Sequence, residues 1–266
     1  MLELASLLLG SLLLRPYVFG FLAVYLLIAM GDWGWRRALL FTGLAGGLAF
    51  AAEFSSTRVG VPFGLYHYTG MTRGRELYLA NVPFFDPLSF TFLAYASLGL
   101  ARLLLGDRGG LGERRLPLAV VAGLLMMWLD VVIDPLAVRG DRWFLGRIFY
   151  YPEPGRYFGV PLANFAGWAL LGTLIVGIWL TLEHRVGGAP ARGSGRLAGR
   201  WYPWYLGAAL YYLVLAFNLA VTAAVAEPAL FWAGLGAHLP LAALVVSSLA
   251  SSSSSSTRPL HAGEPA

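Results

Sequence analysis

The sequence predicts an all-α fold, a polytopic membrane helix bundle of about seven transmembrane helices, on two observations. Hydrophobic residues make up 58% of the 266 residues and charged residues only 12%, with a mean hydropathy of +0.66. Soluble domains carry about 25% charged residues, so this chain has too few to cover a water-facing surface. The apolar residues also gather into segments of roughly 20, the length that crosses a bilayer. We expect one multi-pass domain over residues 1–250, embedded in the cell (inner) membrane.

The ends of the chain differ from the expected spans. The apolar prefix, residues 1–14, is too short to cross a bilayer and is separated from the next segment by Pro16, so we expect it to be interfacial or re-entrant. The Ser-rich tail, residues 251–266, has little to bury and is expected to be disordered. Gly43 and Gly47 form a GxxxG pattern, which favours close helix packing. The expected spans are residues 16–30, 37–54, 84–105, 117–138, 160–182, 203–226 and 228–249.

The composition also excludes several kinds of chemistry. The chain has no cysteine, which rules out disulfides, thiolate metal sites and cysteine nucleophiles. All 19 basic residues are arginine and are scattered through the loops, a placement typical of membrane orientation and not of nucleic-acid binding. The sequence shows neither a nucleotide-binding motif nor a metal-binding histidine spacing. We therefore expect no nucleic-acid partner, no cofactor and no metal site.

Two carboxylates interrupt the apolar segment "MMWLDVVIDPLAV". Asp130 and Asp134 are four residues apart, which places them about 40° apart on one face of a helix. A carboxylate near the middle of a membrane helix costs about 2.5–3.5 kcal/mol on insertion scales. The pair therefore suggests chemistry, although Asp134-Pro135 could instead mark a helix end.

Other polar residues are expected on the same side of the membrane. The loops after the second and fourth spans lie on one face, because two crossings separate them. Glu53 ends the second span, and Asp86 begins the third, where it could also cap a helix before Pro87. The remaining members are Asn164, which opens the fifth span, and Asn218 and Glu227, which approach this side from the sixth span.

Aromatic residues are dense in these two loops. They could form an aromatic belt at the membrane interface, or they could line a pocket for a flat polyene or a developing cation. The two loops also hold Gly and Pro at a density that implies fixed turns. The aromatic residues are Tyr66, Tyr68, Trp143, Tyr150, Tyr151 and Tyr157.

Four segments carry a family resemblance: "AEFSSTRVGVPFGLYHYT", "NVPFFDP", "WLDVVIDPLAVRGDRWF" and "YFGVPLANFAGW". They resemble the carotenoid-biosynthesis membrane proteins that include the CruF-type carotenoid 1,2-hydratases, over roughly residues 52–168. The resemblance implies addition of water to the terminal C1=C2 bond of an acyclic carotenoid end group, of the lycopene or γ-carotene type. The positions that match the motifs are Glu53, Asp130, Asp134, Asp141 and Asn164.

This reaction suits the polar and aromatic residues. Hydration of an alkene needs a proton donor, a dry pocket that tolerates a tertiary cation, and one admitted water. A buried acid pair can share a proton at neutral pH. We expect Asp130, Asp134 and Glu53 to be catalytic, with Asn164 or Glu53 positioning the water. We expect the substrate to be bound by Trp128, Trp143, Trp168, Tyr66, Tyr68, Asn164, Asp86 and Asp141.

Three alternatives remain open at this point. A lycopene-cyclase-type isomerase would use the same protonation, with an internal alkene capturing the cation. A magnesium-dependent prenyltransferase would use Asp130 and Asp134 as metal ligands, but such enzymes need several acids and only one such pair is evident. A non-catalytic carotenoid carrier, or a scaffold for other carotenoid-pathway enzymes, would need the aromatic loops but not Asp130. The expected partners are a hydrophobic carotenoid, the lipid bilayer and, for a scaffold, those enzymes.

Overall fold

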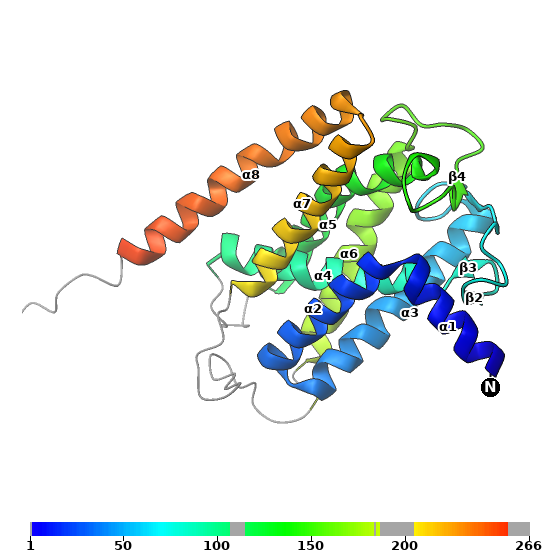
Figure 1. The fold of residues 1–266 in the computed structure, drawn as a ribbon. Helices are drawn as coiled ribbons and strands as arrows, with labels where there is room; N and C mark the ends of the chain where they lie inside the picture. The colour runs from blue at the N-terminus through cyan, green and yellow to red at the C-terminus, as the bar shows by residue number, and fades with distance from the viewer. Residues whose placement is uncertain (1, 107–114, 184, 187–204, 255–266) are drawn as a thin grey trace, which may run out of the picture.

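The computed structural model describes residues 2–106, 115–183, 185–186 and 205–254. These residues form a helix bundle with two small two-stranded sheets, which confirms the all-α prediction (Figure 1). Seven of the described helices are long and apolar enough to cross a membrane. The helices are α1 (Leu2–Leu14), α2 (Pro16–Trp33), α3 (Trp35–Val59), α4 (Phe85–Leu104), α5 (Arg115–Ala137), α6 (Leu162–Leu182), α7 (Leu206–Ala224) and α8 (Pro228–Ser254).

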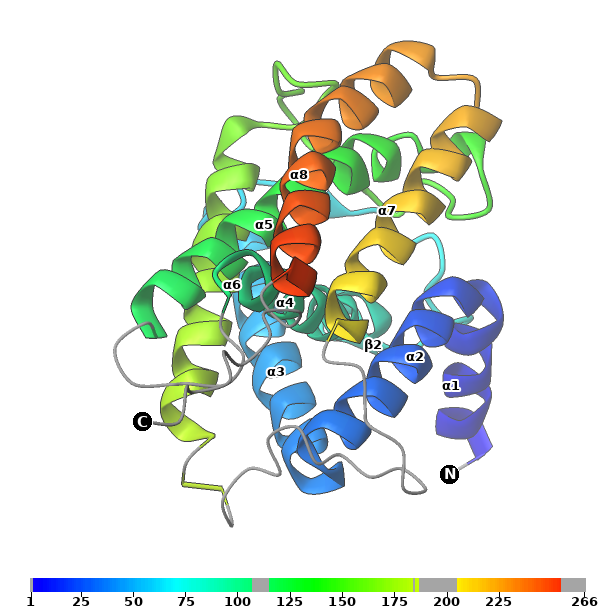
Figure 2. The same ribbon diagram turned by 90° about the vertical axis from the view of Figure 1, so that its left-hand side faces the viewer.

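Helix α4 is the centre of the bundle. It is the most buried of the seven long helices, and Figure 2 shows it behind and between the surrounding helices. Helices α2, α3, α5, α6 and α7 all pack against it. Helix α8 also contacts α4, α5 and α7, and its C-terminal half extends away from the bundle (Figure 1).

The described residues begin in helix α1 and end in helix α8. The apolar prefix forms its own helix, α1, of 13 residues, and Pro16 occupies the first turn of α2, where its missing N–H leaves no hydrogen bond unmade. At the other end, α8 continues four residues into the Ser-rich tail and ends at Ser254. The rest of the tail, residues 255–266, lies outside the described residues.

Glycines allow the closest helix contacts, but not those predicted. A Cβ at Gly123 of α5 would lie 2.5 Å from the Ala169 carbonyl oxygen of α6, so only glycine permits this approach. Gly43 and Gly47 of α3 have no such neighbour within 4 Å, and the prediction that they pack closely is wrong. The buried face of α3 runs through Ala45 and its neighbours at four-residue spacing, which places both glycines on the outer face.

Short strands join the loop after α3 to the loop after α5. Strand β1 (His67–Tyr68) pairs antiparallel with β4 (Phe149–Tyr150), with His67 opposite Tyr150. A second ladder, β2 (Tyr78–Leu79) with β3 (Val82–Pro83), and the turn η1 (Gly140–Arg142) complete the loop layer. Because β1 and β4 belong to the two loops, the pairing confirms that these loops lie on the same side of the bundle.

Candidate active site

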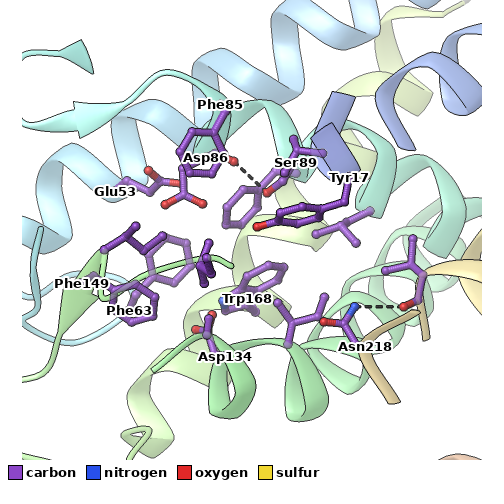
Figure 3. Close-up of a pocket in the computed structure, with 18 of the residues that line it drawn as sticks. Tyr17, Glu53, Phe63, Phe85, Asp86, Ser89, Asp134, Phe149, Trp168 and Asn218 are labelled. Atoms are coloured by element: carbon purple, nitrogen blue, oxygen red, sulfur yellow. Dashed lines mark hydrogen bonds between the residues drawn. The ribbon is translucent and has the colours of Figure 1, made fainter. Parts of the chain in front are cut away.

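A cavity lies under the loop layer, enclosed mainly by helices α2 to α7 (Figure 3). Its volume is about 120 Å³, whereas a single water needs about 10–15 Å³ by this measure, so it has room for an organic group together with water. Half of the lining residues are aromatic and none is Arg or Lys. The cavity lining is therefore mostly apolar, with a few polar groups. Its polar lining residues are Glu53, Asp86, Ser89, Asp134, Asn164 and Asn218, besides the tyrosines.

The first polar group is termed the aspartate pair. It consists of Asp130 and Asp134, together with Asn164, which contacts both aspartates. The Asn164 side-chain amide donates one hydrogen bond to Asp130 Oδ2 and one to Asp134 Oδ2, each 2.7 Å long. Asp134 lines the cavity, whereas Asp130 is 0% exposed and lies behind it. The remaining Asp130 oxygen, Oδ1, is buried without a hydrogen-bond partner among the described residues. A proton shared with the neighbouring Asp134 carboxyl would satisfy it.

The second polar group, termed the tyrosine bridge, consists of Glu53, Tyr68 and Asp86. The Tyr68 hydroxyl lies 2.8 Å from Glu53 Oε2 and 2.7 Å from Asp86 Oδ2. A phenol has one hydrogen and can donate to only one of these oxygens. The other contact needs a hydrogen on the carboxyl, so at least one of the two carboxyls is protonated. Figure 3 shows Glu53 and Asp86 side by side, with Asp134 on a different part of the wall.

The tyrosines around these acids remain protonated phenols. Burial, followed by the negative charges of Asp86 and Glu53, raises the pKa of Tyr68 well above its usual value. Burial and the same two carboxyls also raise the pKa of Tyr66. Burial and the carboxyls of the other polar group raise the pKa of Tyr151. These hydroxyls therefore stay available as hydrogen-bond donors at neutral pH.

Aromatic rings form the wall beside Asp134. Trp168 of α6 lines the cavity and stacks on Phe90 of α4, with ring centroids 4.4 Å apart and an interplanar angle of 23°. Figure 3 shows Trp168 between Asp134 and the acids of the tyrosine bridge. The faces of aromatic rings attract cations. This wall suits a positive charge that develops close to Asp134.

Most of the predicted site residues meet at this cavity. The structure places Glu53 and Asp134 in the wall of one cavity, and it places Asp130 outside the wall, where the Asn164 amide contacts both Asp130 and Asp134. The catalytic roles of these residues stay a prediction. The other predicted residues that line the cavity are Tyr66, Tyr68, Asp86, Trp143, Asn164 and Trp168.

Three predicted positions lie elsewhere. Trp128 is two residues before Asp130, about 200° around the helix, and its indole N–H donates to the Ala237 carbonyl of α8. Asp141 is exposed in η1 and does not line the cavity. Glu227 forms ion pairs with Arg139 and Arg142. The structure therefore corrects the placement of Trp128 and Asp141 in the substrate site.

The helix-end interpretations of two acids are also corrected. Asp86 lies in the first turn of α4, but α4 has no side-chain cap and the Asp86 carboxyl contacts Tyr68 instead. Helix α5 continues through Pro135 to Ala137, so Asp134 does not end it. Both carboxyls are held by partners in the cavity wall.

Several cavity residues had no clear signal in the sequence. Tyr17, Phe21 and Phe217 come from α2 and α7, and Tyr17 stacks on Phe217 with centroids 5.3 Å apart. They lie in ordinary apolar spans, where an aromatic residue is as expected facing lipid as facing a cavity. In the part of the chain that the structure describes, no group of three or more His, Cys, Asp or Glu residues is placed to hold a metal ion.

The two tryptophans allow a direct test of this placement. We expect Trp168→Leu to reduce conversion of the substrate at least tenfold, because it removes the ring beside Asp134. Trp128→Leu should leave conversion within about twofold, because that side chain is 38% exposed and contacts α8. Pigment analysis at matched protein level measures both, and equal losses in the two variants would contradict the assignment.

The fold and the cavity define an integral membrane protein with an acidic, aromatic-lined site. The family model described as "Carotenoid biosynthesis protein" matches residues 13–244, and the chain belongs to this family. The chain is also similar to bisanhydrobacterioruberin hydratase of Haloarcula japonica, at 35% identity over 128 residues. That match covers 48% of this chain and 40% of the relative's length. No solved structure matches the chain.

Proposed function

We propose that this protein is a carotenoid 1,2-hydratase of the cell membrane, which adds water to the terminal C1=C2 bond of an acyclic carotenoid end group. The observation that carries the proposal is an aromatic cavity whose wall presents hydrogen-bonded acids and no base stronger than a carboxylate. Such a cavity can protonate an alkene and hold the resulting cation. Membership of the carotenoid biosynthesis family and similarity to a protein named as a hydratase support the substrate class and the reaction.

The proton donor in this proposal is the aspartate pair. Asp134 faces the cavity and transfers a proton to C2, so that the π electrons form the new C2–H bond and leave a tertiary cation at C1. Asp130 lies behind Asp134 and shares its proton, with Asn164 holding both carboxyls in register. Trp168, stacked on Phe90, presents a ring face to the cation. Water then forms the C1–O bond, and the product is a tertiary alcohol.

The cavity lining argues against diphosphate chemistry. A prenyl diphosphate carries several negative charges, and its site would need cations to balance them. Carboxylates can supply such cations by holding Mg²⁺, but among the described residues no group of three or more His, Cys, Asp or Glu is placed to hold a metal ion, and no Arg or Lys lines the cavity. An uncharged hydrocarbon end group suits the cavity better.

The test is expression of the protein in a host that makes lycopene, followed by chromatography and mass spectrometry of the pigments. We expect products heavier than lycopene by one water. A product of unchanged mass with a cyclised end group would replace the hydratase proposal with a cyclase. Unchanged lycopene that copurifies with the protein would instead support a carrier.

A further inference from the structure

The two polar groups of the cavity share one construction. Each has a partly exposed carboxyl in the cavity wall, Asp134 or Asp86, and a second carboxyl that is deeply buried, Asp130 or Glu53, of which Glu53 also lines the cavity. In each group a single polar side chain contacts both carboxyls. The groups come from different elements, the aspartate pair from α5 and α6 and the tyrosine bridge from α3, β1 and α4. The reaction proposed above uses the aspartate pair and leaves the tyrosine bridge without a role.

Hydration includes a second proton transfer. When water attacks a tertiary cation, the new C–O–H₂⁺ group must lose a proton, and a nearby base makes this step fast. The aspartate pair has just lost its proton to carbon and lies on the side from which the proton came. A base on another part of the wall can hold the water at a distance from the acid.

The tyrosine bridge has the composition that such a base requires. Because the one phenolic hydrogen serves two carboxyl contacts, at least one carboxyl of the bridge is a carboxylic acid that can donate a proton, and the other carboxyl, when ionised, can accept one. Tyr66 also lines the cavity and packs edge-on against Tyr68 with centroids 5.5 Å apart. The tyrosine bridge therefore forms a polar region in an otherwise mostly apolar cavity wall.

The geometry points to the tyrosine bridge as the group that binds the attacking water and accepts its proton, with Asp86 facing the water and Tyr68 connecting Asp86 to Glu53. The inference rests on the proposed hydratase function. Tyr68 is a positioning residue in this scheme, since it acts through the two carboxyls that it connects.

The proton balance closes over one turnover. Asp134 gives one proton to C2, the water oxygen bonds to C1, and one proton of the water passes to the Asp86 carboxylate. Return of a proton from the tyrosine bridge to the aspartate pair, through water in the cavity, restores both groups. The net reaction is alkene plus water to tertiary alcohol, with no oxidant, reductant or other reactant.

The experiment measures the incorporation of deuterium from the buffer into carbon positions of the carotenoid. Membranes that contain each variant are incubated with lycopene in deuterated buffer, and both product and recovered lycopene are analysed by mass spectrometry. Asp86→Asn, Glu53→Gln and Tyr68→Phe should lower hydrated product at least a hundredfold, as expected for loss of a general base. Their recovered lycopene should still gain deuterium, because the cation forms, finds no activated water and loses a proton again. Asp134→Asn should give neither product nor deuterium in lycopene.

The controls separate a chemical role from a folding defect. Tyr150→Phe is the matched change for Tyr68→Phe, since Tyr150 lies on the neighbouring strand β4, is exposed and does not line the cavity. It should hydrate lycopene at the wild-type rate. Each variant should also elute as a single species from size-exclusion chromatography in detergent.

Two results would overturn the assignment. Tyrosine-bridge variants that give neither product nor deuterated lycopene would show that this group supports protonation or the fold. Variants that hydrate lycopene normally would show that it has no part in the reaction. A wild-type protein that neither hydrates nor deuterates lycopene would overturn the hydratase proposal itself, and this inference with it.

Discussion

Asp134→Asn is expected to abolish hydration, with a fall in rate on the order of a hundredfold or more, because the variant has no proton to give to the alkene. Asparagine keeps the size of the side chain and can still hydrogen-bond to Asn164. An amide is also cheaper to bury than a charge, so the protein should insert into the membrane at least as well. The measurement is the ratio of hydrated to unreacted carotenoid at matched protein level.

The companion variant tests the aspartate pair as a unit. Asp130 has no contact with the cavity, but its carboxyl shares the Asn164 amide with Asp134. Asp130→Asn should therefore also reduce hydration strongly. The variant should also shift the pH profile of the remaining activity, because Asp134 no longer shares a proton with the Asp130 carboxyl. Glu153→Gln is the control, since Glu153 is exposed in the same loop layer and lies outside the cavity. Full activity in Asp134→Asn would mean that another acid protonates the substrate.

Gly123→Ala is expected to destabilise the helix bundle. The added Cβ would meet the Thr173 hydroxyl and lie 2.5 Å from the Ala169 carbonyl oxygen, so α5 and α6 must move apart. Overpacking of this kind costs about 1–3 kcal/mol. Since Asn164 reaches both aspartates from α6 over distances of 2.7 Å, activity should fall together with the apparent unfolding temperature in detergent.

Gly47→Ala provides the control for this change. Gly47 is also a glycine within a long apolar helix, but a Cβ there has nothing within 4 Å. Alanine favours helix over glycine by about 0.5–1 kcal/mol, so the variant should be as stable as the wild type or slightly more stable. A Gly123→Ala protein as stable and active as Gly47→Ala would contradict the close packing of α5 and α6.

The sequence predicted the helices well because hydrophobicity and length determine them. All seven expected spans correspond to helices; the first begins at Pro16 as predicted, and other ends differ by a few residues, as on both sides of Gly34. The GxxxG pattern failed because a pattern of small residues does not say which face of α3 turns inward. The face was set by the bulkier Phe41 and its neighbours, which pack in the bundle.

The acids of the site could be predicted because polar groups are costly in an apolar span. Glu53, Asp130 and Asp134 stand out for this reason, and the same-face argument placed them together. Their hydrogen-bond partners could not be derived, because Tyr68 reaches Glu53 and Asp86 only when the loop after α3 folds over the bundle. Aromatic residues gave the weakest signal, although the two-residue spacing from Asp130 already places Trp128 on the opposite face of its helix.

The β1–β4 ladder also has a consequence for biogenesis. Tyr68 is held by a strand whose partner, Phe149–Tyr150, is made some 80 residues later in the chain. A ribosome that has released only the first three long helices has delivered Glu53, Tyr68 and Asp86, but not the strand that holds Tyr68 in place. The site can therefore be completed only after α5 and the following loop have reached the same side of the membrane, so a chain inserted with one crossing missing would separate the two strands across the bilayer.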